Sequence, residues 1–125
     1  MDKSPESQQE NSLRSFSSVI LLTANLKLDL DGAVLIREHE ETLLTAREVG
    51  LLRILVHTTY TSRGYISSKS LARRLISSEA FDPEHCIEQT ISVLRRKLGE
   101  PPRHPSILKG RRGLGYRLFL LQESG

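Results

Sequence analysis

Short apolar runs separated by polar turns fill the stretch from residue 19 to residue 44. In the segment Leu26-Lys27-Leu28-Asp29-Leu30, apolar and polar residues alternate with a period of two, as in a strand that buries one face. The next pair, Asp31-Gly32, is typical of a hairpin turn. The runs at 19–23, 26–30, 33–36 and 41–44 therefore predict four strands, which would pair as a small antiparallel sheet.

From residue 44 onward the spacing of apolar residues becomes helical. Thr45 as N-cap and Glu48 three residues later form a capping box, and Leu44 and Val49 can pack together across the first turn. Apolar residues then keep helical spacing as far as residue 56. A long helix is therefore expected after the sheet, and a turn that contains Arg63-Gly64 would follow it.

Two more helices are predicted. The first is short, is capped by Ser67 or Ser68, and would bury Leu71, Ala72 and Leu75. The second begins with Asp82 at the N-cap and Pro83 at the first helical position. Its apolar stripe has the spacing i, i+4, i+7 and i+11 and consists of Ile87, Ile91, Leu94 and Leu98. Gly99 would end this helix, because the prolines at 101 and 102 prevent its continuation.

The last part of the chain predicts a β-hairpin. Its strands would cover 106–109 and 116–121, joined by the Gly- and Arg-rich segment 110–115. The order of sheet, three helices and hairpin indicates an α+β fold of one domain over residues 19–121. The polar, Ser- and Gln-rich segment 1–18 would be a disordered arm.

Charge is distributed unevenly along the chain. Residues 1–60 carry 6 basic and 9 acidic side chains, whereas residues 61–125 carry 12 basic and 6 acidic ones. Between residues 95 and 117 there are 8 basic side chains and a single acidic one, Glu100. Such a polarised surface is expected for a protein that binds a polyanion, although basic solvated faces are also common.

The third helix offers candidate binding residues on the side opposite its apolar stripe: His85, Gln89, Ser92, Val93 and Arg96. In a DNA major groove, glutamine can pair with adenine, arginine with guanine, and an exposed valine can contact a thymine methyl group. Arg95 and Lys97 would lie to the sides, where phosphates pass. The alternative is an ordinary amphipathic helix with a solvated face, but an exposed Val93 would then have no partner.

The hairpin is the second candidate binding element, with Lys109, Arg111 and Arg112 as its basic residues. A slender tip with arginines between glycines suits a narrow minor groove, whose negative potential attracts them. The segment 110–115 could instead cradle nucleotide phosphates, but it lacks the Lys-Ser/Thr ending of a P-loop and precedes no helix. We therefore expect nucleic acid rather than a nucleotide at this tip.

Catalytic and metal-binding patterns are missing from the sequence. The four histidines have no metal-ligand spacing, no Gly-x-Ser-x-Gly motif occurs, and the single cysteine, Cys86, excludes a Cys-rich zinc site. We therefore expect no catalytic residue, no metal and no cofactor, and a protein that is not an enzyme. The sequence also lacks an apolar run of about 18 residues and a signal-peptide core, which predicts a cytoplasmic protein without membrane contact.

Taken together, these segments resemble the OmpR/PhoB-type winged-helix effector domain of response regulators, over roughly Leu26 to Leu120. The residues that carry the resemblance are Leu44-Thr45-x-x-Glu48-Val49-x-Leu51-Leu52, Ser67-x-x-x-Leu71, Ile87-x-x-x-Ile91-x-x-Leu94-Arg95-Arg96-Lys97-Leu98 and Gly113-Leu114-Gly115-Tyr116-Arg117-Leu118. The resemblance implies a winged helix-turn-helix with a four-stranded N-terminal sheet, three helices and a C-terminal wing.

The resemblance also implies roles for single residues. The recognition helix would be 83–98, Arg95 would contact the DNA backbone, and Arg112 in the wing would enter the minor groove. Gly113, Gly115 and Tyr116 would shape and anchor the wing. Residues 77–82 would touch RNA polymerase, and weak homodimers would form on direct repeats.

The sequence departs from the family pattern at several positions. Ser92 and Val93 stand where members often carry basic residues, Gly110 replaces a common threonine, and Ile76 replaces a tryptophan. Members also usually carry an N-terminal receiver domain with a phosphorylated aspartate, for which 125 residues leave no room. Either a stand-alone regulator or a receiver domain outside this sequence is therefore expected.

These observations predict a nucleoid-associated transcription regulator that binds double-stranded DNA through the third helix and the wing. The alternative is a winged-helix module that binds a regulator or an RNA polymerase subunit without DNA specificity, an interpretation that Ser92 and Val93 favour. RNA binding has little support, because 3 tyrosines and 3 phenylalanines provide few aromatic side chains on which bases could stack.

Overall fold

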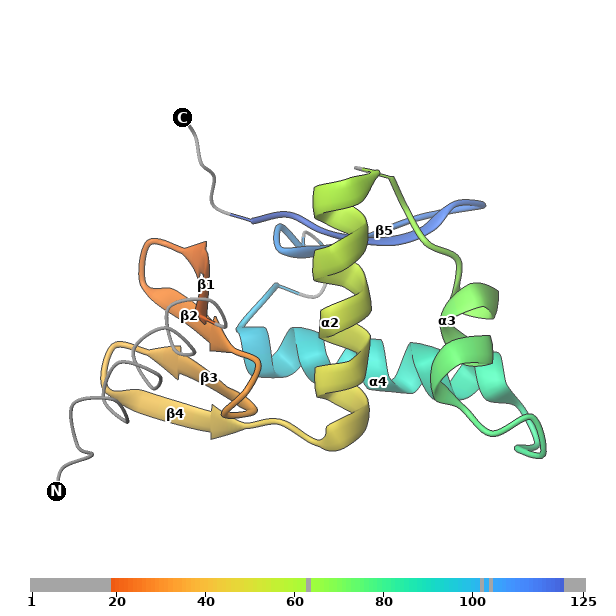
Figure 1. The fold of residues 1–125 in the computed structure, drawn as a ribbon. Coiled ribbons are helices and arrows are strands. Elements are labelled where there is room, and N and C mark those ends of the chain that lie inside the picture. Colours follow the sequence, from red (N-terminus) through yellow and green to blue (C-terminus); the bar gives the residue numbers. More distant parts are fainter. Residues whose placement is uncertain (1–18, 63, 102, 104, 121–125) are drawn as a thin grey trace, which may run out of the picture.

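The computed structural model describes residues 19–62, 64–101, 103 and 105–120, so the predicted arm 1–18 lies outside the described residues. Strands β1 (Val19–Thr23), β2 (Leu26–Asp29), β3 (Val34–Arg37) and β4 (Glu40–Leu43) form an antiparallel sheet in the order β1-β2-β3-β4. Helices α2 (Ala46–Thr61), α3 (Ser68–Leu75) and α4 (Pro83–Leu98) follow, and β5 (Leu108–Arg111) pairs with β6 (Gly115–Leu118) (Figure 1). The predicted α+β architecture is confirmed.

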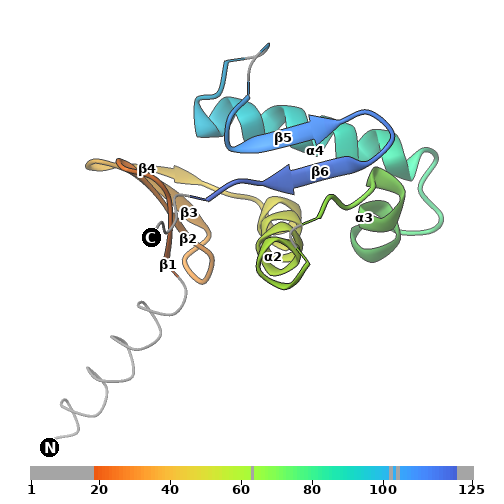
Figure 2. The ribbon, with the colours of Figure 1, turned by 90° about the horizontal axis from the view of Figure 1, so that it is seen from above.

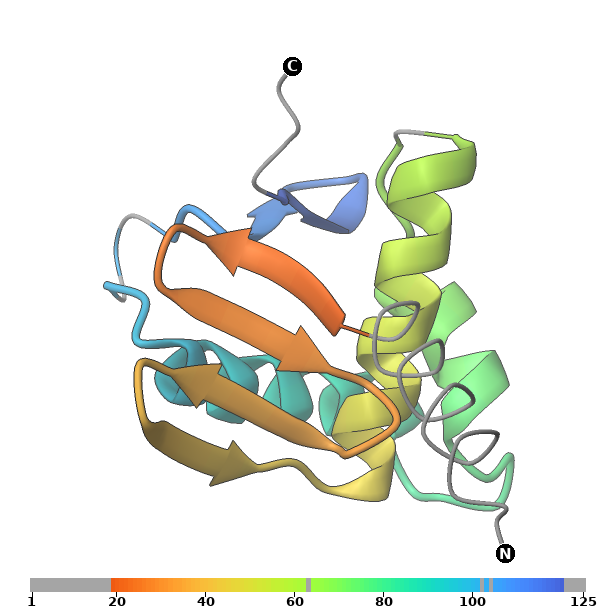
Figure 3. The ribbon, with the colours of Figure 1, turned by 60° about the vertical axis from the view of Figure 1, so that its left-hand side comes forward.

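Helix α2 stands between the sheet and α3, while α4 and the β5–β6 hairpin run across one side of all three (Figure 2). Figure 3 shows the sheet face-on, with α4 behind it. We call the β5–β6 hairpin, residues 108–118, the wing. No helix in the described part of the chain is long and apolar enough to cross a membrane.

The turn between β2 and β3 differs from the predicted two-residue Asp-Gly hairpin. Here the residue with positive φ is Ala33, at 58°, and not Gly32. The backbone N–H of Gly32 donates to Asp29 Oδ1 at 3.0 Å, and that of Ala33 donates to the Leu30 carbonyl at 3.3 Å. The Asp29 side chain therefore organises a longer turn, which ends β2 one residue earlier than the alternating pattern indicates.

The start of α2 is the predicted capping box. Thr45 Oγ1 accepts the N–H of Glu48 at 3.1 Å, and Glu48 Oε1 accepts the N–H of Thr45 at 2.9 Å. The same Glu48 oxygen also accepts a hydrogen bond from Lys97 Nζ of α4 at 2.8 Å, and Lys97 Nζ donates to the Leu43 carbonyl at 3.0 Å as well. Glu48 is only 4% exposed. Its carboxylate therefore caps α2 and also forms a largely buried ion pair with Lys97 of α4.

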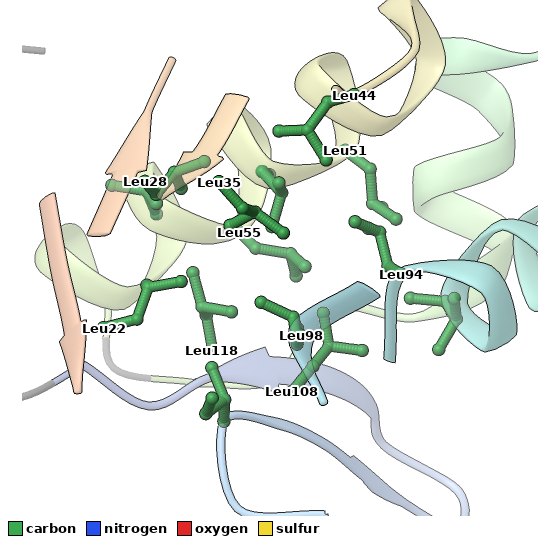
Figure 4. Packing of buried hydrophobic residues seen from close by; sticks show 14 of the residues in the cluster. Leu22, Leu28, Leu35, Leu44, Leu51, Leu55, Leu94, Leu98, Leu108 and Leu118 are labelled. Carbon is green, nitrogen blue, oxygen red and sulfur yellow. The ribbon is translucent and has the colours of Figure 1, made fainter. Parts of the chain in front are cut away.

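The core lies where α4 meets α2, the sheet and the wing. The predicted α4 stripe of Ile87, Ile91, Leu94 and Leu98 is buried along its whole length. It packs in one cluster with residues of each neighbouring element, among them Leu28, Leu35, Leu51, Leu55, Leu108 and Leu118 (Figure 4). Asp82 caps α4 with Pro83 directly after it, and Gly99 ends it at φ 78°, as the sequence predicts.

The wing strands lie closer to the tip than predicted. Gly110 and Arg111 belong to β5, because Gly110 pairs with Tyr116 and Arg111 with Gly115, so only residues 112–114 connect the strands. Near the tip of the wing, one residue pair from the connection, Tyr116 exchanges two backbone hydrogen bonds with Ile66, each of 2.9 Å. A Cβ atom at Gly115 would collide with the Ile66 carbonyl, so this close approach requires glycine.

The dual role of Glu48 leads to a stability prediction. Glu48→Ala removes one half of the capping box and leaves Lys97 without its carboxylate. Because losing a cap costs about 1 kcal/mol and breaking a largely buried ion pair costs more, we expect the free energy of unfolding to fall by roughly 3 kcal/mol. Urea denaturation followed by circular dichroism measures it. The matched control is Glu41→Ala on the exposed strand β4, for which we expect a change within about 0.5 kcal/mol.

Candidate nucleic-acid interface

Helix α4 presents the predicted outer face to solvent. His85, Gln89, Ser92 and Arg96 are exposed, whereas Val93 is only half-buried and therefore not the freely exposed valine that the helical pattern predicts. Val93 and Gln89 line a shallow hollow of about 460 Å³ together with Thr45, Ala46, Arg47 and Glu48 at the start of α2. The first turn of α2 therefore covers one edge of the outer face of α4. This partial burial of Val93 depends on tertiary packing and could not be predicted from the helical pattern.

A larger open cleft of about 750 Å³ lies between the start of α3, α4 and the wing. Its lining residues are Ser67, Ser68 and Lys69 of the α3 start, Glu84, Glu88 and Arg95 of α4, and residues 110–116 of the wing. The fold thus brings Arg95, Arg111 and Arg112, three of the predicted binding residues, to one cleft. Sequence reasoning missed Lys69, Glu84 and Glu88, although the spacing i, i+4 of the two glutamates places them on one side of α4.

Arg95 connects α4 to the wing. Its Nε donates to the carbonyl of Leu108 at 2.9 Å, and its guanidinium carbon lies 5.8 Å from the centroid of the Tyr116 ring. A Cβ atom at Gly110 would lie 3.1 Å from the Tyr116 ring and 3.3 Å from the Arg95 guanidinium, so glycine leaves room for both. Part of the Arg95 side chain is therefore used within the domain, and its predicted contact with the DNA backbone stays a prediction.

Tyr116 lies at the junction of α4 and the wing. Burial raises the pKa of Tyr116 above its usual value, the negative charge of Glu88 raises it further, and the positive charge of Arg95 partly opposes both. The phenol therefore stays protonated at neutral pH, and Tyr116 is one of the residues that line the cleft. A neutral donor of this kind can bind a phosphate oxygen without adding charge.

The other predicted basic residues divide into two groups. Lys97 is engaged with Glu48 and the Leu43 carbonyl, on the side of α4 away from the cleft. Lys109 has its Nζ 4.8 Å from the centroid of the Phe119 ring. Arg111 and Arg112 are exposed at the wing tip, where the N–H of Leu114 closes the turn onto the Arg111 carbonyl at 2.9 Å.

The side chains that line the cleft are mostly charged or carry hydroxyl groups. Within residues 19–62, 64–101, 103 and 105–120, no group of three or more His, Cys, Asp or Glu side chains is placed to hold a metal ion. The cleft combines cations, hydroxyl groups and two carboxylates on three rigid elements, and it is open along its length. An open, mostly basic groove beside an exposed helix suits an extended polyanion.

Comparisons with known proteins agree with this geometry. The family model described as "Transcriptional regulatory protein, C terminal" matches residues 39–118. The transcriptional regulatory protein KdpE of Mycobacterium tuberculosis is 30% identical over 99 residues, which are 78% of this chain and 42% of KdpE. Protein PetR of Rhodobacter capsulatus is 35% identical over 95 residues, 74% of this chain and 40% of PetR. The chain therefore spans about two fifths of the length of these relatives.

A solved structure supports the fold assignment. The DNA-binding domain of CpxR from E. coli is 27% identical and superposes with a TM-score of 0.57, over 79% of this chain and 94% of that domain.

The contact between Arg95 and the wing gives a prediction about local stability. In Arg95→Ala the wing loses a hydrogen bond and a ring contact, whereas the buried stripe of α4 keeps all its partners. We expect amide hydrogen exchange of the wing to become about fivefold faster, as for the loss of roughly 1 kcal/mol, and that of Ile91 and Leu94 to stay unchanged. The control is Arg96→Ala on the exposed face of the same helix, and equal acceleration in both variants would contradict the assigned role of Arg95.

Proposed function

Because this chain belongs to the family of transcriptional regulatory protein C-terminal domains, the OmpR/PhoB-type winged-helix effectors, we propose that it binds double-stranded DNA sequence-specifically and regulates transcription. The observation that carries the proposal is an open cleft between α4, the start of α3 and the arginines of the wing tip, which lies beside the exposed outer face of α4. Helix α4 and the wing are thus two binding elements held next to each other, as simultaneous contact with two grooves requires.

Helix α4 would enter the major groove, which admits an α-helix. Gln89, Ser92 and Arg96 would face base edges, with Gln89 suited to adenine and Arg96 to guanine. Val93 would contact a thymine methyl group only with the part of its surface that the start of α2 leaves open. The lack of bulky basic residues at 92 and 93 leaves more of the base reading to Gln89 and Arg96.

The wing would contact the neighbouring minor groove. Arg112 is exposed between β5 and β6, and Gly113 beside it adopts φ 81°, which keeps the tip slender and sharply turned. Arg111 and Lys109 would approach the flanking phosphates, together with Lys69 at the start of α3. Lys97 would contribute less than its charge suggests, because Glu48 already holds its ammonium group.

The relatives support the same function. KdpE is by name a transcriptional regulatory protein, and the CpxR domain is by name a DNA-binding domain. Neither name indicates an enzyme, in agreement with the absence of a catalytic pattern in the sequence. We extend DNA binding from these proteins to this chain because the cleft unites the residue types that it requires.

A contact with another protein has one specific observation in its favour. Phe81, in the loop between α3 and α4, is 102% exposed, and large aromatic side chains are enriched among the residues that anchor protein interfaces. The loop 77–82 is the segment for which the family resemblance implies a contact with RNA polymerase. We therefore propose that Phe81 anchors a protein contact made by the DNA-bound domain.

The DNA-binding proposal is tested by selecting bound duplexes from a random pool, with the wild type, Gln89→Ala and Arg112→Ala. We expect one enriched motif for the wild type and the loss of preference at one base pair for Gln89→Ala. For Arg112→Ala we expect affinity to fall for every sequence, and the slope of log K against log salt to decrease by about one. The control is Arg53→Ala on α2, whose exposed ion pair with Asp31 lies outside the cleft.

Sequence-specific binding would be contradicted if the selection recovers no motif. The remaining binding would then be weak, would disappear at high salt and would be the same for the wild type, Gln89→Ala and Arg112→Ala. This result would favour the protein-interaction module instead.

The role of Phe81 is tested separately. In Phe81→Ala no packing is lost, so we expect the melting temperature and the DNA affinity to stay unchanged. Transcription from a promoter that carries the selected motif should fall at least fivefold in a reconstituted assay with RNA polymerase. Equal transcription by the variant and the wild type would contradict the contact.

A further inference from the structure

The cleft between α4 and the wing carries charges of both signs. Glu84 and Glu88 lie on α4, which also contributes Arg95, whereas the wing tip and the start of α3 contribute the cations Arg111, Arg112 and Lys69. A polyanion that enters the cleft is attracted to the cations and repelled by the two glutamates. Phosphates therefore belong beside the wing and α3, and a group that hydrogen-bonds to Glu88 has to be something other than a phosphate.

Glu88 contributes little to the stability of the domain. Its Oε1 lies 3.9 Å from Nδ1 of His85, but both side chains are more than half exposed, and such pairs are worth little. Glu84 lies four residues earlier on the same helix, where two like charges destabilise a helix slightly. Packing and pairing thus give no reason for a carboxylate at this position.

The chemistry of a carboxylate restricts its partners in the major groove. An ionised carboxylate only accepts hydrogen bonds, so it cannot bind phosphate oxygens or the O6 and N7 atoms of guanine, which are acceptors too. The exposed donors are the N4 amino group of cytosine and the N6 amino group of adenine. Adenine also presents its N7 acceptor beside the amino group and repels a carboxylate there, whereas cytosine has no acceptor at its edge.

We propose that Glu88 is a specificity-determining residue that accepts a hydrogen bond from the N4 amino group of one cytosine in the bound duplex. This assignment rests on the proposed binding of DNA through the cleft. Glu88 lines the cleft on the wing side of α4, whereas Gln89 lines the hollow on the α2 side, so the two side chains read different base pairs.

Selection of bound duplexes with Glu88→Gln and Glu88→Ala tests the assignment. In the wild-type motif we expect a cytosine at one position. Glu88→Gln should change that position to adenine, because glutamine pairs with adenine N6 and N7. Glu88→Ala should reduce discrimination there by roughly 5- to 100-fold and leave the other positions intact. The control is Glu41→Gln on β4, which makes the same change in charge far from the cleft and should return the wild-type motif.

Other outcomes separate this assignment from the proposed function itself. If both Glu88 variants return the wild-type motif, or gain affinity equally for all duplexes, the carboxylate does not read a base and the assignment is overturned, while DNA binding stands. If the wild type yields no motif, the proposed function fails and the assignment fails with it. Because Glu88 is exposed, we expect both variants to keep the wild-type circular dichroism spectrum and melting temperature.

Discussion

Helix α4 has to bury one face completely and keep the opposite face open, and the rest of the domain is arranged around this requirement. Ile87, Ile91, Leu94 and Leu98 are at most 2% exposed, because α2, the sheet and the wing all contribute to the same core. A helix that is packed from several directions cannot rotate about its axis without exposing apolar surface. Its outer face therefore keeps one direction relative to the wing before any ligand binds.

Polar contacts hold the C-terminal part of α4 on two sides. Toward the sheet, Lys97 bonds to Glu48 and Leu43, and Arg37 donates to the Leu98 carbonyl at 2.7 Å. Toward the wing, Arg95 bonds to Leu108. Basic residues that cannot be told apart in the sequence thus have different roles. Arg37, Arg95 and Lys97 bond within the domain, and only their burial and hydrogen-bond partners distinguish them from basic residues that are available to a ligand.

The wing is held at its base and again through Tyr116 of β6, and the residues that connect its strands extend beyond this second contact. The carboxylate of Glu100 accepts the backbone N–H groups of Ser106, Ile107 and Leu108 as the chain enters β5, and β6 bonds to Ile66. Beyond Gly110, the arginines of the tip have solvent around them. A rigid base with an exposed tip sets the distance between the wing arginines and the outer face of α4, and this distance would determine which two stretches of a duplex are read together.

The sequence by itself determined the features that depend on local hydrogen bonds and periodicity. Thr45, Asp82 and Gly99 mark helix ends because capping is decided within a few residues, and the α4 stripe follows from 3.6 residues per turn.

Only the tertiary structure decided what depends on distant partners. Val93 is half-covered by the start of α2, and Lys97 finds a carboxylate 49 residues away. The wing strands extend to Arg111 because of pairing across the hairpin, and Glu88 faces the wing because the core orients α4. Contacts between distant segments have no signature in the spacing of residues along the chain. The cations of α4 and the wing were therefore predictable, but Lys69 and the division of the cations into structural and free ones were not.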